Sequence, residues 1–132
     1  IVSTFAQMNA KGNTYNACYH VLTGNDGKIS DRCNNKVITS IESMKGRWNR
    51  VTLHLLAQSK KPIVDIFFNS VHVAHFEQSL SKDPEYYFLK YGIYRSFVSR
   101  HRGPMPTQVA YYDEVKVGTS KEEVENEQQV LD

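Results

Sequence analysis

One stretch of the chain, YYFLKYGIYR at residues 86–95, combines reactive side chains with the spacing of a β-strand. Side chains of a strand alternate between its two faces, so Lys90, Gly92 and Tyr94 are expected to share one face. Glycine has no side chain, so Gly92 leaves this face open for a bulky ligand to approach the backbone between a cation and a phenol. The alternative is an ordinary solvated strand face. The same face is predicted to carry two further aromatic residues, Tyr86 and Phe88.

The N-terminal stretch IVSTFAQMN has a matching pattern. Its alternation predicts that Gln7 and Asn9 share one face of a strand with Ser3 and Phe5. Both are neutral hydrogen-bonding side chains that can reach a carboxylate or sugar hydroxyls. Polar residues on an outer strand face are also ordinary, so this pattern alone does not identify a site.

Charge is distributed unevenly along the 132 residues. Residues 1–112 hold 14 Lys and Arg against 7 Asp and Glu, whereas residues 113–132 hold 2 against 7. A basic body favours an anionic partner, although a normally solvated surface explains the same charges. The segment VSRHRGPMPT at 98–107 adds three basic side chains on a predicted surface loop.

The periodicity predicts an all-β fold in one domain, an antiparallel sandwich or jelly roll. SKEEVENEQQV is expected to form a short terminal helix or to stay without fixed structure. No apolar run approaches the roughly 18–20 residues that span a membrane. The predicted strands are 1–9, 15–23, 28–33, 36–41, 50–58, 63–69, 71–76, 86–95 and 108–117, with a hairpin turn at Asn69 and Ser70.

Two cysteines, Cys18 and Cys33, flank a strong turn signal, GNDG at residues 24–27. In a regular hairpin centred on that turn the two cysteines lie opposite each other, within disulfide range at a non-hydrogen-bonded pair. We therefore expect a disulfide and a secreted, extracellular protein, with two buried free thiols as the alternative.

Four segments together resemble a known family: GRWNRVTLHLL, IVDIFFNSVHV, YYFLKYGIYRS and PTQVAYYDEVKVG. Their order is similar to the C-terminal part of jelly-roll polysaccharide lyases of the heparin-lyase-like and glucuronan-lyase-like group, with alginate lyases as more distant relatives. The Lys-x-Gly-x-Tyr element and the Tyr-Tyr-Asp ending carry most of the specificity. The resemblance implies a concanavalin-like jelly roll over residues 1–118, followed by an acidic tail at 119–132.

The resemblance implies β-elimination on a polysaccharide that contains uronic acid. Tyr94 matches the tyrosine that takes the C5 proton, donates one to the leaving O4, or does both. Lys90 matches the basic neighbour on the same face, and Gln7 matches the glutamine of a Gln-x-His motif that helps to neutralise the substrate carboxylate. Asn9 stands where that motif has histidine, so the resemblance does not extend to a histidine general base, and a tyrosine can serve both proton transfers. The glycine of the family is kept as Gly92.

Elementary chemistry agrees with these roles. The C5 proton of a uronate is poorly acidic because the neighbouring carboxylate is already negative, so neutralising that carboxylate stabilises the enolate-like intermediate. Free tyrosine has a pKa near 10, and positive charge from Lys90, Arg95 or His101 is expected to favour the phenolate. The phenol can then act as base and as acid in turn. The predicted substrate-binding residues are Gly92, Arg95, Arg100, His101 and Arg102.

Lyases of this type also carry an Arg-x-Glu-type element on a strand before the glutamine strand, which these residues lack. A sheet that lacks early strands exposes its edges, which natural proteins avoid. We therefore expect an N-terminal partner chain, domain swapping or a close oligomer to complete the fold.

Other chemistries find less support in the sequence. His72 and His75 are three residues apart on a predicted strand, which puts them on opposite faces, so the five histidines suggest no metal site. Asp65 and Glu77 on neighbouring strands are poor candidates for paired glycosidase carboxylates. No cofactor is expected to be required, and structural calcium at Gly24–Gly27 is left open, without EF-hand spacing.

The leading hypothesis is thus a secreted polysaccharide lyase. The alternative is a non-catalytic, lectin-like jelly roll that binds acidic glycans through the same basic surface, and a third reading is a structural half of a larger assembly. In each of the first two cases the partner is an acidic polysaccharide, with neither nucleic acid nor membrane expected.

Overall fold

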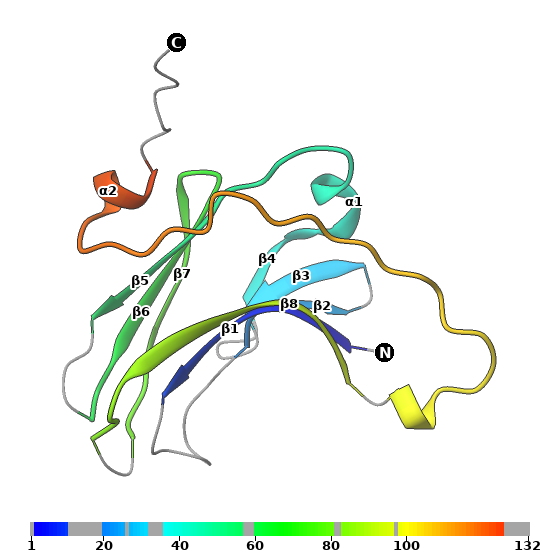
Figure 1. The fold of residues 1–132 in the computed structure, drawn as a ribbon, viewed down its shortest axis with the longest axis horizontal. Coiled ribbons are helices and arrows are strands. Elements are labelled where there is room, and N and C mark those ends of the chain that lie inside the picture. The colour runs from blue at the N-terminus through cyan, green and yellow to red at the C-terminus, as the bar shows by residue number, and fades with distance from the viewer. Residues whose placement is uncertain are drawn as a thin grey trace.

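Antiparallel strands make up most of the computed structural model, which describes residues 2–10, 20–25, 27–31, 36–56, 60–80, 83–96 and 98–125 (Figure 1). They form one five-stranded sheet and one three-stranded sheet. Helices in this part of the chain are short: α1 (Ile41–Met44), a 3-10 turn η1 (Val98–Arg100) and α2 (Lys121–Glu125). The all-β prediction is confirmed.

The five-stranded sheet has the order β4–β3–β2–β1–β8, with every neighbouring pair antiparallel. Its strands are β1 (Val2–Ala10), β2 (His20–Asn25), β3 (Lys28–Asp31), β4 (Lys36–Ser40) and β8 (Tyr87–Ser96). The first and last of the described strands are therefore neighbours, and β8 forms one edge of the sheet.

The three-stranded sheet carries the main hydrophobic core. Its strands are β5 (Val51–Leu56), β6 (Ile63–Phe68) and β7 (Val71–Glu77), in that order. Alternate residues of β6 and β7 are buried because only one face of the sheet points inward. Ala6 of β1 and Ile38 of β4 pack against this core, so both sheets contribute to it. The buried core residues are Val64, Ile66, Ala74 and Phe76.

The β6–β7 hairpin turns where the sequence predicted. Asn69 and Ser70 have φ values of 49° and 68°, the left-handed pair that a two-residue type I′ turn requires. The backbone N–H of Arg50 donates to the Asn69 side-chain oxygen over 2.8 Å. The turn is thereby fixed to the chain that enters β5.

The β2–β3 hairpin is centred one residue later than the sequence suggested. Asn25 pairs with Lys28, and Gly24 pairs with Ile29, so the turn is at 26–27 and not at 25–26. Gly27 has a φ of 75°, which explains a glycine at this place. The geometric argument that set the two cysteines opposite each other therefore loses its basis. Cys18 and Cys33 themselves lie outside the described residues, as does Asp26 of the suggested calcium loop.

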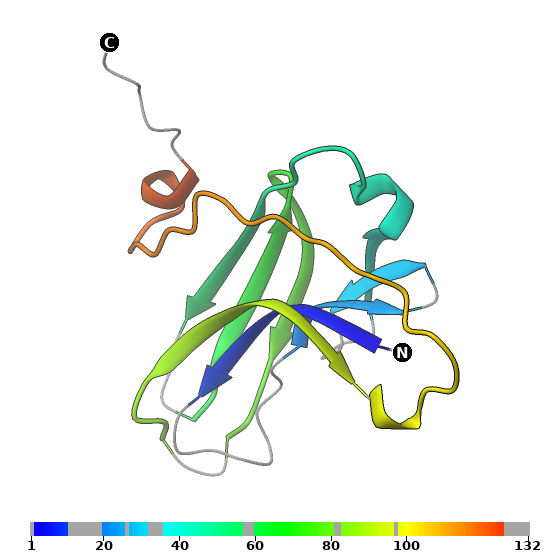
Figure 2. The same ribbon diagram turned by 45° about the vertical axis from the view of Figure 1, so that its right-hand side comes forward.

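The strand expected at 108–117 is not formed. Residues 106–118, here called the closing segment, run without sheet pairing from the β8 side of the molecule toward α2 (Figures 1 and 2). Side chains hold this segment: the Gln108 oxygen accepts from the Ser3 hydroxyl over 2.9 Å and from Arg95 Nε over 2.7 Å. Glu114 has a φ of 51°, which interrupts the extended run that a strand needs.

The start of the acidic tail folds back on the three-stranded sheet. Helix α2 confirms part of the expected terminal helix, and residues 126–132 lie outside the described part. The Thr52 hydroxyl donates to Glu125 over 2.8 Å, and Lys121 Nζ lies 4.5 Å from the centre of the Phe67 ring. Within the described ranges, no helix has the length and apolar character needed to cross a membrane.

Candidate functional site

The pairing of β1 with β8 joins the two strands that carry the predicted catalytic residues. Gln7 is the register partner of Lys90, and Asn9 is the partner of Phe88. Thr4 is the partner of Tyr94. Directly paired residues of antiparallel strands are about 4.5–5.5 Å apart, so Gln7 and Lys90 belong to one small region although 83 positions separate them in the sequence.

A β-bulge interrupts β8 between Lys90 and Tyr94. Thr4 pairs with Tyr94 and Ala6 with Tyr91, so two residues of β8, Gly92 and Ile93, stand opposite one residue of β1. Gly92 has a φ of 132°, a conformation that residues with a side chain rarely adopt. A backbone requirement therefore accounts for this glycine. The extra residue also breaks the alternation on which the predicted common face of Lys90 and Tyr94 rested. An added Cβ at Gly92 meets nothing within 4 Å, so the surface there is open as predicted.

Aromatic rings and a cation gather on one side of the start of β8. The rings of Tyr86 and Phe88 have centroids 5.8 Å apart, and Lys90 Nζ lies 5.6 Å from the centre of the Phe88 ring. These contacts agree with the predicted common face of the three residues. Tyr86 is 55% exposed, so the group, here called the aromatic–lysine surface, is accessible to a ligand.

Tyr94 is exposed, with 61% of its surface accessible. Its neighbour Arg95 bonds to the closing segment through Gln108 and the carbonyl oxygen of Pro106. The guanidinium of Arg95 thus anchors the closing segment, a role that the sequence did not suggest. Its predicted contact with substrate stays a prediction.

Tyr112 of the closing segment adds a second link at the same place. Its hydroxyl donates to the carbonyl oxygens of Gly92, over 2.8 Å, and of Phe5, over 3.1 Å. Its ring lies 5.3 Å from the ring of Tyr91. The closing segment therefore binds to both strands at the bulge.

The basic loop follows the end of β8. Arg100 ends η1, and the backbone N–H of His101 donates to the Val98 carbonyl over 3.1 Å. The His101 ring is 3.3 Å from the Pro104 carbonyl oxygen, and Arg102 is exposed. All three basic residues lie on the surface, as the sequence predicted for this segment.

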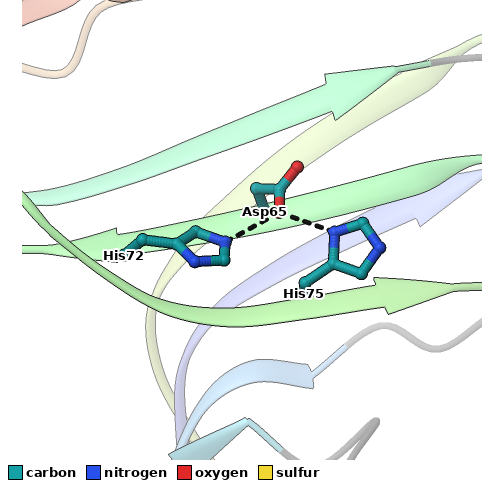
Figure 3. Close-up of side chains that lie close together, drawn as sticks. All are labelled: Asp65, His72 and His75. Carbon is teal, nitrogen blue, oxygen red and sulfur yellow. Dashed lines mark hydrogen bonds and ion pairs between the residues drawn. The ribbon is translucent and has the colours of Figure 1, made fainter.

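A second cluster, which the sequence reasoning missed, lies on the three-stranded sheet (Figure 3). His72 Nε2 and His75 Nδ1 are 2.8 Å and 2.7 Å from the same oxygen of Asp65. Figure 3 shows both rings turned toward the Asp65 carboxylate. One ligand atom from each residue lies within 4.8 Å of the others, close enough to share a metal ion.

The expectation that His72 and His75 lie on opposite faces is wrong, because β7 contains a bulge. Phe67 pairs with His72 and Ile66 with Ala74, which leaves Val73 as the extra residue. Val73 and Ala74 both contact the core. The two histidines that flank this pair consequently point outward together. The available sequence signal was the composition of the hairpin, an aspartate followed by two histidines, rather than its alternation.

Electrostatics within this cluster favour the charged forms. Burial works to raise the pKa of Asp65, but hydrogen bonds from His75 and His72 outweigh it and hold that pKa below its ordinary value. The hydrogen bond to Asp65 raises the pKa of His75, against a smaller opposing effect of burial. Hydrogen bonding in the cluster therefore favours the ionised carboxylate of Asp65 and the protonated form of His75.

Further groups surround the cluster. Glu77 Oε1 lies 3.6 Å from His75 Nε2, the ring nitrogen that does not face Asp65. His54 Nδ1 lies 3.8 Å from the second oxygen of Asp65, and the Phe67 ring is 5.2 Å from the His72 ring. These residues all come from the outward side of β5, β6 and β7, away from the core.

Comparison with known proteins finds no matching family model, no similar curated protein and no similar solved structure.

Proposed function

We propose that the chain is a polysaccharide lyase that cleaves a polymer containing uronic acid by β-elimination at the β1–β8 surface. The observation that carries the proposal is the register of these strands, in which Gln7 pairs directly with Lys90. This pairing brings together two residues that the family resemblance assigns to binding of the substrate carboxylate. The same resemblance supports a jelly-roll arrangement of the two sheets, completed by a partner chain or an oligomer.

The chemistry assigned to Tyr94 is a pair of proton transfers. As a phenolate it takes the C5 proton of the uronate; the C5–H electrons form the C4=C5 double bond and the C4–O4 bond breaks. The resulting phenol then gives its proton to the departing O4. Lys90 and Gln7 bind the substrate carboxylate and reduce its negative charge, which stabilises the intermediate. The exposure of Tyr94 supports this role, because the polymer has to reach the hydroxyl.

Binding of an acidic sugar chain has its own support. The aromatic–lysine surface offers ring faces for sugar stacking and a cation for a carboxylate. Gly92 keeps the surface beside it open. Beyond the end of β8, Arg100, His101 and Arg102 extend the positive charge over a further part of the surface.

The test is the absorbance of the 4,5-unsaturated uronate, measured with a panel of polyuronates and glycosaminoglycans. We expect the native chain to produce this absorbance and Tyr94→Phe to lose it by at least about 100-fold, the usual size of an acid–base contribution. Tyr111→Phe is the matched control, since Tyr111 is an 81% exposed tyrosine of the closing segment. Equal rates in the native and Tyr94→Phe chains would overturn the assignment of Tyr94.

A non-catalytic carbohydrate-binding module is the second candidate. Asn9 in place of histidine and the neighbouring rings of Tyr86 and Phe88 favour it, because stacking on aromatic rings binds sugars without any proton transfer. This candidate predicts saturable binding of acidic oligosaccharides with no new absorbance, and a loss of that binding in Lys90→Ala.

A further inference from the structure

We propose that Asp65, His72 and His75 form a binding site for a divalent transition-metal ion of the Zn²⁺ type on the outward face of the three-stranded sheet. Two imidazole nitrogens and one carboxylate oxygen converge there within 4.8 Å. Three protein ligands of this kind, with coordination positions left to solvent, are a recurrent set for zinc and for other imidazole-binding metals.

The ligand atoms are close to the spacing that a metal requires. Tetrahedral coordination at about 2.0–2.1 Å separates neighbouring ligand atoms by roughly 3.3 Å. The two histidine nitrogens are 2.8 Å and 2.7 Å from Asp65 Oδ1, so each nitrogen has to move away from that oxygen by about half an ångström. His72 and His75 are each about half exposed, so small side-chain rotations supply this change without disturbing the core.

The residues that contact the proposed ligands are arranged like those that support the ligands of a metal site. A ligating histidine usually gives its second ring nitrogen to a carboxylate, which fixes the orientation of the ring. Glu77 stands 3.6 Å from the second nitrogen of His75, and the Phe67 ring packs against His72. His54, 3.8 Å from the other oxygen of Asp65, adds a third imidazole beside the carboxylate.

The chemistry of the donors selects the class of ion. Calcium and magnesium prefer oxygen ligands, whereas imidazole suits zinc, copper, nickel and iron. Two imidazoles with one carboxylate therefore exclude a dedicated calcium site here. The bulge at Val73 is what brings both imidazoles to one face of β7, and such bulges are frequent beside functional sites.

The test is isothermal titration of the untagged full chain with Zn²⁺. We expect one ion per chain, with the affinity weakened at least about tenfold in His72→Gln, His75→Gln and Asp65→Asn, and about tenfold in Glu77→Gln. His101→Gln is the matched control, because it removes an exposed histidine outside the cluster. Circular dichroism of each variant verifies that the sheets are intact.

A second readout follows the coordination directly. Co²⁺ added to the native chain is expected to give the visible absorption bands of a low-symmetry four- or five-coordinate ion, and these bands are expected to vanish in His75→Gln but not in His101→Gln. The proposal is overturned if Zn²⁺ shows no saturable binding to the folded native chain, or if the folded cluster variants bind it as tightly as the native chain does.

Discussion

At the scale of single residues, the Tyr112 hydroxyl links three segments of the chain. It donates to the carbonyl oxygens of Phe5 in β1 and Gly92 in β8, while its own backbone belongs to the closing segment. Tyr112 is not fully buried, so the contribution of these bonds to stability is expected to lie in the lower part of the usual range for a hydrogen bond.

Tyr112→Phe is expected to lower the free energy of unfolding by about 1 kcal/mol, because both bonds are lost while the ring is kept. The measurement is chemical denaturation of the native and variant chains at neutral pH. Tyr111→Phe, which removes the hydroxyl of the exposed neighbour, is the control and is expected to change stability little. A Tyr112→Phe chain as stable as the native one would contradict the linking role.

The Tyr112 hydroxyl makes the difference in stability between the native and Tyr112→Phe chains depend on pH. Burial raises the pKa of Tyr112, so the folded state favours the neutral phenol more than the unfolded state does. The stabilisation is therefore fully present below the unfolded pKa of about 10 and is lost as the pH rises through the higher folded value. The stability difference between the native and Tyr112→Phe chains is expected to shrink above about pH 10. A difference that grew with pH would contradict the sign of the shift.

At the scale of elements, the bulge in β8 depends on one glycine. Gly92→Ala is expected to destabilise the fold by roughly 1–3 kcal/mol, because its φ of 132° is strained for alanine although the space around it is empty. Gly46→Ala is the comparison: Gly46 also has open space, but its φ of 72° is a left-handed conformation that alanine tolerates better. Thermal unfolding of both variants measures the difference, and equal losses would mean that the β8 bulge is not specially dependent on glycine.

Bulges also explain how far the sequence could predict this molecule. Within the described residues, the eight strands lie within or close to predicted ones, because alternation and turn residues such as Asn69 and Ser70 are local signals. Alternation assumes a regular strand, however, and cannot show where an extra residue such as Val73 enters. It therefore assigned His72 and His75 to opposite faces and missed their cluster with Asp65.

The closing segment shows a second limit. Its sequence alternates like a strand, but residues 106–118 are held by the side chains of Arg95, Gln108 and Tyr112 rather than by a backbone ladder. Whether an extended segment joins a sheet depends on contacts with residues far along the chain, which local pattern cannot supply. The pairing of β1 with β8 is equally non-local, and only the family resemblance, not the strand pattern, suggested that Gln7 and Lys90 act together.

At the scale of the whole molecule, the two candidate sites belong to different sheets. The β1–β8 surface lies at one edge of the five-stranded sheet, whereas the Asp65 cluster lies on the outward face of the three-stranded sheet. The buried residues of β6 and β7 point away from the cluster, so the core stands between that face and the other sheet. The core therefore separates a metal ion at the cluster from the site proposed for elimination at β1–β8.

This separation predicts that chelation lowers the stability of the chain but leaves its elimination rate unchanged. Adding EDTA to the zinc-loaded chain is expected to lower its thermal stability. A free Zn²⁺ concentration of 100 times the dissociation constant adds about 2.7 kcal/mol to the free energy of unfolding, and EDTA removes that contribution. The rate of uronate elimination is expected to stay the same, provided that the assay is run well below the unfolding temperature. Asp65→Asn serves as the matched variant, with the elimination rate of the native chain and no stabilisation by zinc. A fall in elimination that returns with added Zn²⁺ would show instead that the two sheets share one catalytic centre.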